Sequence, residues 1–150
     1  MPTTPEVDQT NPRRPLGIWG LSLYAAVIAG IIPTVAALLV VLSPENQEQL
    51  GLTTLSLFFS LALGLGIVVT SIGVIRGSDR SRKLLFLLLV IHYGLIIVNN
   101  GLLIFMDDLT SEEQTLAIAR VLRSALIPAL YAWYFSRPYV KPHFLPKNEA

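Results

Sequence analysis

The chain contains no cysteine among its 150 residues. This absence excludes a structural disulfide, a thiolate nucleophile, a thiolate metal site and disulfide exchange with a quinone. Charge is also scarce, since only 14% of the residues are charged, whereas a typical soluble domain has about a quarter. The net charge of +1 provides no basic field that would attract nucleic acid, so we expect no nucleic-acid partner.

The few charges are bunched between long uncharged runs, a pattern that is typical of a multi-pass membrane protein. A helix rises about 1.5 Å per residue, so about 20 apolar residues cross a bilayer core of about 30 Å. We expect four spans, at about residues 16–42, 50–75, 84–106 and 116–135. Only the last contains charged residues, Arg120 and Arg123. The sequence therefore predicts an all-α integral membrane protein.

Short polar segments, residues 43–49, 76–83 and 107–115, connect the expected spans. Such short connections make consecutive helices antiparallel, which predicts an up-down four-helix bundle over residues 16–137. Thr110 and Glu113 have the spacing of a capping box at the start of the last helix. Small residues four positions apart in the first two spans predict close helix packing, either within one chain or in a homodimer.

The basic residues fall into three groups: Arg13 and Arg14 before the first span, Arg76, Arg80, Arg82 and Lys83 between the second and third, and Arg137, Lys141 and Lys147 after the fourth. The other two connections carry only acidic charges. The positive-inside rule therefore predicts a multi-pass protein of the cytoplasmic (inner) cell membrane with both termini in the cytoplasm. Residues 1–15 are polar and proline-rich, which predicts a disordered cytoplasmic tail that is not a cleaved signal peptide.

The C-terminal segment, residues 138–150, is predicted to be a cytoplasmic tail that lies along the membrane interface. Aromatic rings favour the headgroup level, and lysines favour anionic lipid. The alternative is a docking peptide for a partner. The residues that we assign to this interface are Trp133, Tyr134, Arg137, Tyr139, Lys141 and Phe144.

Polar side chains inside the spans are candidates for function because they are costly in lipid. Depths counted from Asp107 and Glu113 along two antiparallel helices place Asn99 and Asn100 level with the arginines of the last span. We therefore predict an outer-leaflet cluster of Asn99, Asn100, Arg120, Arg123, Ser56 and Ser60. Two interpretations stay open. The cluster binds an anion or lipid headgroup, or the arginines snorkel to the acidic loop while the asparagines bond to neighbouring helices.

His92 and Tyr93 are expected near the midplane, with no charged partner in reach. A midplane histidine can relay protons, ligate haem or contact a quinone. The other histidine, His143, lies in the tail, so one chain cannot supply two histidines to a haem in the bundle. We interpret His92 as a neutral residue that is hydrogen-bonded to a neighbouring helix. We expect no catalytic residue, cofactor or metal site.

Both ends of the chain carry short motifs that resemble those of a group of small, uncharacterised prokaryotic integral membrane proteins, of the domain-of-unknown-function type. The N-terminal match is Arg14, Pro15, Leu16 and Gly17. The C-terminal match is Tyr134, Phe135, Arg137, Pro138, Val140, Lys141 and Phe144. The resemblance implies four membrane helices in a bacterial or archaeal inner membrane, and it implies no activity.

The sequence favours a non-enzymatic membrane protein that is a structural or accessory subunit, or an interaction partner, of a larger membrane assembly. Its expected partners are the lipid bilayer, other membrane-protein subunits or a second copy in a homo-oligomer. The alternative is a small transporter or a lipid- or anion-binding protein that uses the Asn/Arg cluster. A third hypothesis, an enzyme that acts on lipid or quinone through His92, requires a second titratable group that the spans do not supply.

Overall fold

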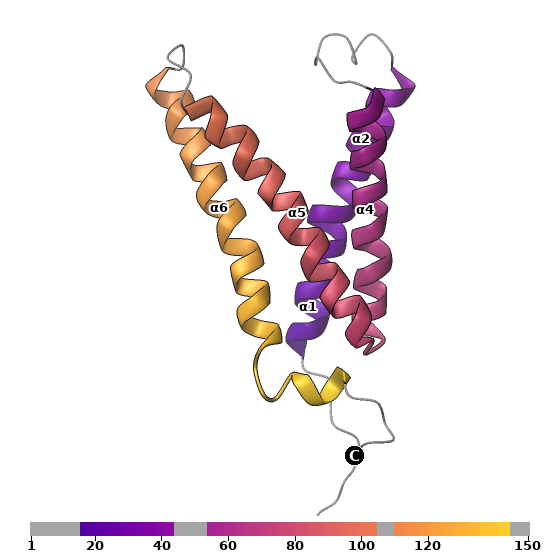
Figure 1. Ribbon diagram of the computed structural model, residues 1–150. Helices are drawn as coiled ribbons and strands as arrows, with labels where there is room; N and C mark the ends of the chain where they lie inside the picture. The colour runs from indigo at the N-terminus through magenta and orange to yellow at the C-terminus, as the bar shows by residue number, and fades with distance from the viewer. Residues whose placement is uncertain (1–15, 44–53, 105–109, 145–150) are drawn as a thin grey trace, which may run out of the picture.

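The computed structural model describes residues 16–43, 54–104 and 110–144, and in these residues every regular element is helical. The elements are α1 (Leu16–Tyr24), η1 (Ala25–Ile31), α2 (Ile32–Leu42), α4 (Thr54–Ile75), α5 (Asp79–Ile104), α6 (Ser111–Phe135) and the short η2 (Lys141–Phe144). Since α1, η1 and α2 follow without a break, the described chain forms four long helices (Figure 1). Each is long and apolar enough to cross a membrane. The predicted all-α bundle is confirmed, and the predicted N-terminal tail lies outside the described residues.

The first long helix widens into a π-helical segment, η1, at its centre. The cause is Pro33, which follows the first residue of α2. A proline inside a helix lacks an N–H donor, and its ring clashes with the carbonyl four residues earlier. The wider turn removes this conflict, and the Ile32 N–H donates to the carbonyl of Val27 instead. The helix therefore continues through the proline.

The turn between α4 and α5 is shorter than the predicted connection of residues 76–83. Gly77 has a φ of 89°, a conformation that favours glycine. Its N–H bonds to the carbonyl of Val74 and the next N–H, from Ser78, bonds to Gly73, both at 3.0 Å. This pair of bonds is the Schellman motif that ends many helices.

Helix α5 then begins at Asp79, five residues before the expected span start at Leu84. Ser78 accounts for the early start, because its hydroxyl accepts a hydrogen bond from the N–H of Ser81 at 3.3 Å. The capping box predicted for α6 is confirmed. The N–H of Glu113 donates to the Thr110 hydroxyl, and the Thr110 N–H donates to the Glu113 carboxylate. This cap makes α6 begin at Ser111.

The four helices converge at one end and separate at the other. In Figure 1, α5 runs diagonally, so that its first turns lie beside α4 and its last turns beside α6. The first helix lies against α4. We call α1, η1, α2 and α4 the first arm, and α5 with α6 the second arm. The arms meet near η2, at the converging end, and diverge toward the opposite, open end.

The hydrophobic core lies at the converging end, and the buried face of α6 shows why. That face carries the small residues Ala117 and Ser124 toward the open end, and the bulky residues Tyr131 and Phe135 toward the converging end. Small side chains let α6 approach α5, whereas the two aromatic rings hold the helices further apart and fill the space between them. The core comprises Ile18, Ala25, Ala29, Leu63, Ile67, Val74, Leu85, Leu89, Tyr93, Tyr131, Phe135, Val140 and Phe144.

The first arm is held together by a close approach of two backbones at Gly30 and Gly64. A methyl group added at Gly64 would lie 2.9 Å from the Gly30 carbonyl oxygen and would also meet the Thr34 hydroxyl. A methyl group added at Gly30 would lie 3.2 Å from the Gly64 carbonyl oxygen. The predicted packing of the first two spans within one chain is therefore confirmed.

Replacing Gly64 by alanine should destabilise the protein by about 1–3 kcal/mol, because the added methyl group overpacks this contact. The matched control is Gly94→Ala in α5, where a methyl group would have no heavy atom within 4 Å. Thermal unfolding of both variants in the same detergent is the measurement. We expect a lower unfolding temperature for Gly64→Ala and no loss for Gly94→Ala. Equal unfolding temperatures would contradict the close approach.

Candidate functional site

A cavity of about 410 Å³ lies between the two arms, and we call it the inter-arm cavity. It forms because α5 diverges from α4 toward the open end, and α6 packs against α5 (Figure 1). The first arm contributes two apolar residues, and the second arm contributes every polar one together with Ile96. The lining residues are Ile28, Pro33, His92, Tyr93, Ile96, Arg120, Arg123 and Ser124.

Two arginines give the inter-arm cavity its charge. Arg120 and Arg123 are three residues apart on α6, so they share one face of the helix. Both side chains are exposed. Neither forms an ion pair with a described acidic residue, and this includes Glu112 and Glu113 at the start of the same helix. Two guanidinium groups therefore face a partly apolar cavity without a described counter-ion.

Tyr93 and His92 add further polar groups to the cavity wall. The Tyr93 side chain is buried, and its hydroxyl has no hydrogen-bond partner among the described residues. A buried hydroxyl without a partner costs about 1–3 kcal/mol. The imidazole of His92 packs edge-on against the Tyr93 ring, with ring centroids 5.1 Å apart. The hydroxyl and the imidazole are both able to bond to a polar group in the cavity.

The asparagines line a different cavity, of about 220 Å³, between α4 and α5. Its lining residues are Phe59, Ser60, Leu63, His92, Leu95, Ile96, Asn99 and Asn100. Asn100 is buried, and its amide donates to the Ile96 carbonyl of its own helix at 2.8 Å. Asn99 is exposed. This bond ties Asn100 to α5 rather than to another helix.

The predicted Asn/Arg cluster is thus divided between two cavities, and only His92 and Ile96 line both. Ser60 lies with the asparagines, whereas Ser56 lines neither cavity. Arg123 and His92 line the same cavity, and the expectation that His92 has no charged partner in reach stays a prediction.

The predicted common depth of the asparagines and the arginines stays a prediction, because the chain directly after Ile104 lies outside the described residues. The structure places His92 and Arg123 in the wall of one cavity. The cavity residue Ser124 was missed. The spacing of Ala117, Ser124 and Tyr131 at every seventh position was the signal that could have identified the inner face of α6.

The residues assigned to the membrane interface divide into outward and inward groups. Trp133 and Tyr139 are exposed, and the Arg137 guanidinium lies 4.0 Å above the Trp133 ring. The prediction does not hold for Phe144, which is 5% exposed and packs against Phe135, with ring centroids 5.9 Å apart. The end of the described tail therefore docks on the bundle.

Tyr134 also packs inward. Its ring lies over Gly17 at the start of α1, where an added methyl group would meet the tyrosine hydroxyl. Lys141 is exposed. Interface contact for the outward residues Trp133, Arg137, Tyr139 and Lys141 stays a prediction.

No family model, curated protein or solved structure matches this chain. The resemblance of the chain ends to small prokaryotic membrane proteins therefore stays a prediction. The four membrane-compatible helices indicate a multi-pass membrane protein.

Because the chain lacks cysteine, a single introduced thiol reports on the inter-arm cavity alone. Ile28→Cys places a thiol on the cavity wall, at a partly exposed position, and Ser71→Cys places one in a fully buried position of α4. With a water-soluble thiosulfonate reagent, we expect Ile28→Cys to react more than about tenfold faster than Ser71→Cys, since access controls thiol labelling. Labelling of the purified protein followed by mass spectrometry is the measurement. Similar rates at the two positions would contradict an open cavity.

Proposed function

We propose that this multi-pass membrane protein binds an anionic amphiphile in the inter-arm cavity. Such a ligand has a phosphate or carboxylate head and an apolar chain. The observation that carries the proposal is the pair Arg120 and Arg123, which line the cavity without an ion pair to a described acid. Buried or membrane-embedded charge is costly unless it is paired, so this arrangement favours an anionic occupant.

The polar groups of the second arm suit the head of such a ligand. Guanidinium groups bind phosphate and carboxylate through paired N–H donors, and two of them on one helix face can hold one head together. The Tyr93 hydroxyl supplies an additional donor that is otherwise without a described partner. The His92 ring supplies a further polar contact beside it.

The apolar groups of the cavity suit the chain of the ligand. Ile28 and Pro33 come from the first arm, and Ile96 comes from α5. A volume of about 410 Å³ lies in the range of small-molecule sites, about 300–1,000 Å³. It accommodates a head and the first part of an acyl chain. The rest of the chain would extend between the arms into the bilayer.

We propose binding without catalysis. Among the described residues, the inter-arm cavity offers one imidazole, one phenol and two guanidinium groups, and none of its described lining residues is a carboxylate. Guanidinium groups stay protonated, so proton transfer would fall to the imidazole and the phenol without a described carboxylate to orient them. We therefore assign His92 the role of positioning the head of the ligand.

The role of accessory subunit is the second proposal, and the outer face of α6 supports it. In the described structure, α6 packs mainly against α5. Leu122, Leu126, Leu130 and Trp133 form an exposed apolar stripe along α6. Such a stripe meets either lipid or the helix of another subunit. A second copy of the chain or a different membrane protein would fit there.

The change Arg123→Leu tests the ligand proposal. It removes one guanidinium group and leaves a shorter, apolar side chain at an exposed position of α6. We therefore expect intact folding and a loss of bound anionic lipid of at least about tenfold, as charged hydrogen bonds contribute about 1.5–3 kcal/mol. The matched control is Arg80→Gln, which removes an exposed arginine at the converging end. Native mass spectrometry of the proteins from mild detergent measures retained lipid and bound subunits together.

Two outcomes would contradict the ligand proposal. Equal lipid retention by Arg123→Leu and the unchanged protein would show that the cavity does not hold the lipid head. A protein partner that co-purifies without lipid, and that Arg123→Leu does not displace, would instead support the accessory role.

A further inference from the structure

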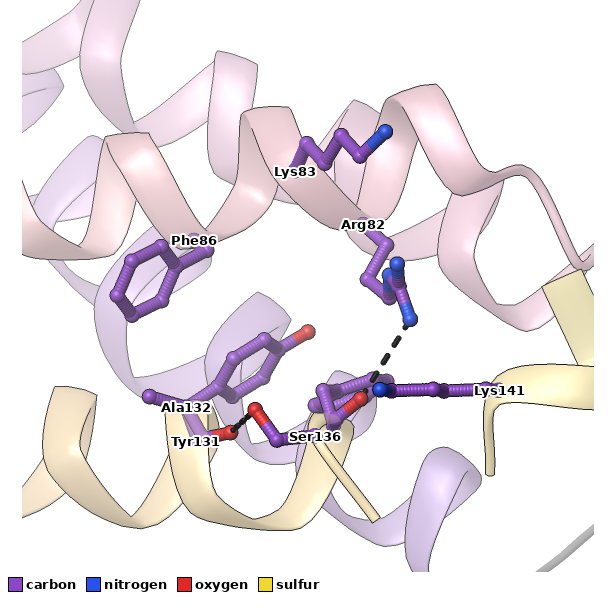
Figure 2. Close-up of a pocket in the computed structure, with 8 residues that line it drawn as sticks. Arg82, Lys83, Phe86, Tyr131, Ala132, Ser136 and Lys141 are labelled. Carbon is purple, nitrogen blue, oxygen red and sulfur yellow. Dashed lines mark hydrogen bonds between the residues drawn. The ribbon is translucent and has the colours of Figure 1, made fainter. Parts of the chain in front are cut away.

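A third pocket, also of about 220 Å³, lies at the converging end between α5 and α6, and we call it the basal pocket (Figure 2). Three cations and three aromatic rings line it together with two small residues. They are Arg82, Lys83, Lys141, Phe86, Tyr131, Phe135, Ala132 and Ser136. We infer that the basal pocket binds the headgroup of an anionic phospholipid. This site is separate from the inter-arm cavity and does not depend on the function proposed there.

The basal pocket follows from the shape of the bundle. The bulky residues of α6 hold it away from α5 near the converging end, and Tyr131 and Phe135 stack on each other with ring centroids 4.4 Å apart. Figure 2 shows the rings of Phe86 and Tyr131 between the two helices. These rings form an apolar wall that is continuous with the membrane-spanning part of the bundle.

Arg82 makes three contacts on the polar side of the pocket and holds the surrounding elements together. Its guanidinium Nη1 donates to the Phe135 carbonyl at 3.4 Å, which satisfies an acceptor at the end of α6. The same guanidinium lies 4.9 Å from the centre of the Phe144 ring and pairs with Asp79. Arg82 thus ties η2 to the ends of α5 and α6, and η2 carries Lys141 to the rim.

The charges of the pocket do not balance. Asp79 is the one described acid that pairs there, with Arg82 and with Lys83, the latter at 2.7 Å. Lys141 forms no ion pair with a described residue. In Figure 2 its ammonium group extends toward the Arg82 side of the pocket. Three cations beside one carboxylate leave positive charge for an anion.

The surroundings favour a lipid over a soluble phosphate. The cations lie within the first turns of α5 and just beyond α6, at the basic end that the charge pattern predicts to be cytoplasmic. Phe86 is 38% exposed and lies one turn further along α5, toward the membrane. Cations at the headgroup level above an apolar wall match the two parts of a phospholipid.

The test uses the full chain in neutral detergent with added phosphatidylglycerol, and phosphatidylcholine as the uncharged comparison. We expect Lys141→Gln to weaken phosphatidylglycerol binding about fivefold, the factor for loss of one basic group near a headgroup. Ala132→Leu fills the pocket without changing its charge, and it should weaken binding as well. Arg80→Gln removes an exposed arginine of α5 outside the pocket, and it should leave binding unchanged. Native mass spectrometry measures the bound lipid.

These outcomes distinguish a specific binding pocket from non-specific electrostatic attraction between the lipid and the protein surface. Equal losses in Lys141→Gln and Arg80→Gln would overturn the proposal in favour of diffuse surface charge. Unchanged binding by Ala132→Leu, with thermal unfolding as a check on its fold, would overturn pocket occupancy. Glycerol phosphate that displaces the lipid at equal concentration would show a soluble-phosphate site, which would overturn the assignment to a lipid.

Discussion

In a bilayer, apolar helix faces gain little by covering one another, so close contact between backbones decides which helices pair. In this chain the contact lies at Gly30 and Gly64, where the first helix meets α4. That contact packs the first helix tightly against α4 and so holds the first arm together. Helix α5 is joined to it through the turn at Gly77, and its diagonal course then separates α6 from the first arm. The two-armed shape depends on this pairing.

The gradient of side-chain size along α6 explains why the bundle has openings at both ends. Small residues on its inner face bring α6 close to α5 at the open end, so the space falls between the arms. Tyr131 and Phe135 separate the two helices at the converging end, so the space there falls between α5 and α6. Each opening combines cations with apolar walls, which is the chemistry of an amphiphile with an anionic head.

The sequence was sufficient to predict the parts of the structure that depend on local signals. Apolar length predicted four helices, the Thr110 and Glu113 pair predicted the start of α6, and small residues predicted the first arm. The candidate site could be predicted only in part, because the grouping of polar residues depends on the tilt of α5 and on where each helix ends. The docking of Phe144 depends on Arg82 and Phe135, which come from two different helices. No local pattern encodes such a contact.

We propose that the arms stay apart at the open end and hold an anionic amphiphile between them. A high-resolution electron cryomicroscopy map of the full chain in lipid nanodiscs, with a bound antibody fragment for alignment, tests it most directly. We expect separated arms and elongated non-protein density in the inter-arm cavity, with its head at Arg120 and Arg123. Arms that close so that α6 packs against α2, or a cavity filled by a helix of another subunit, would contradict it.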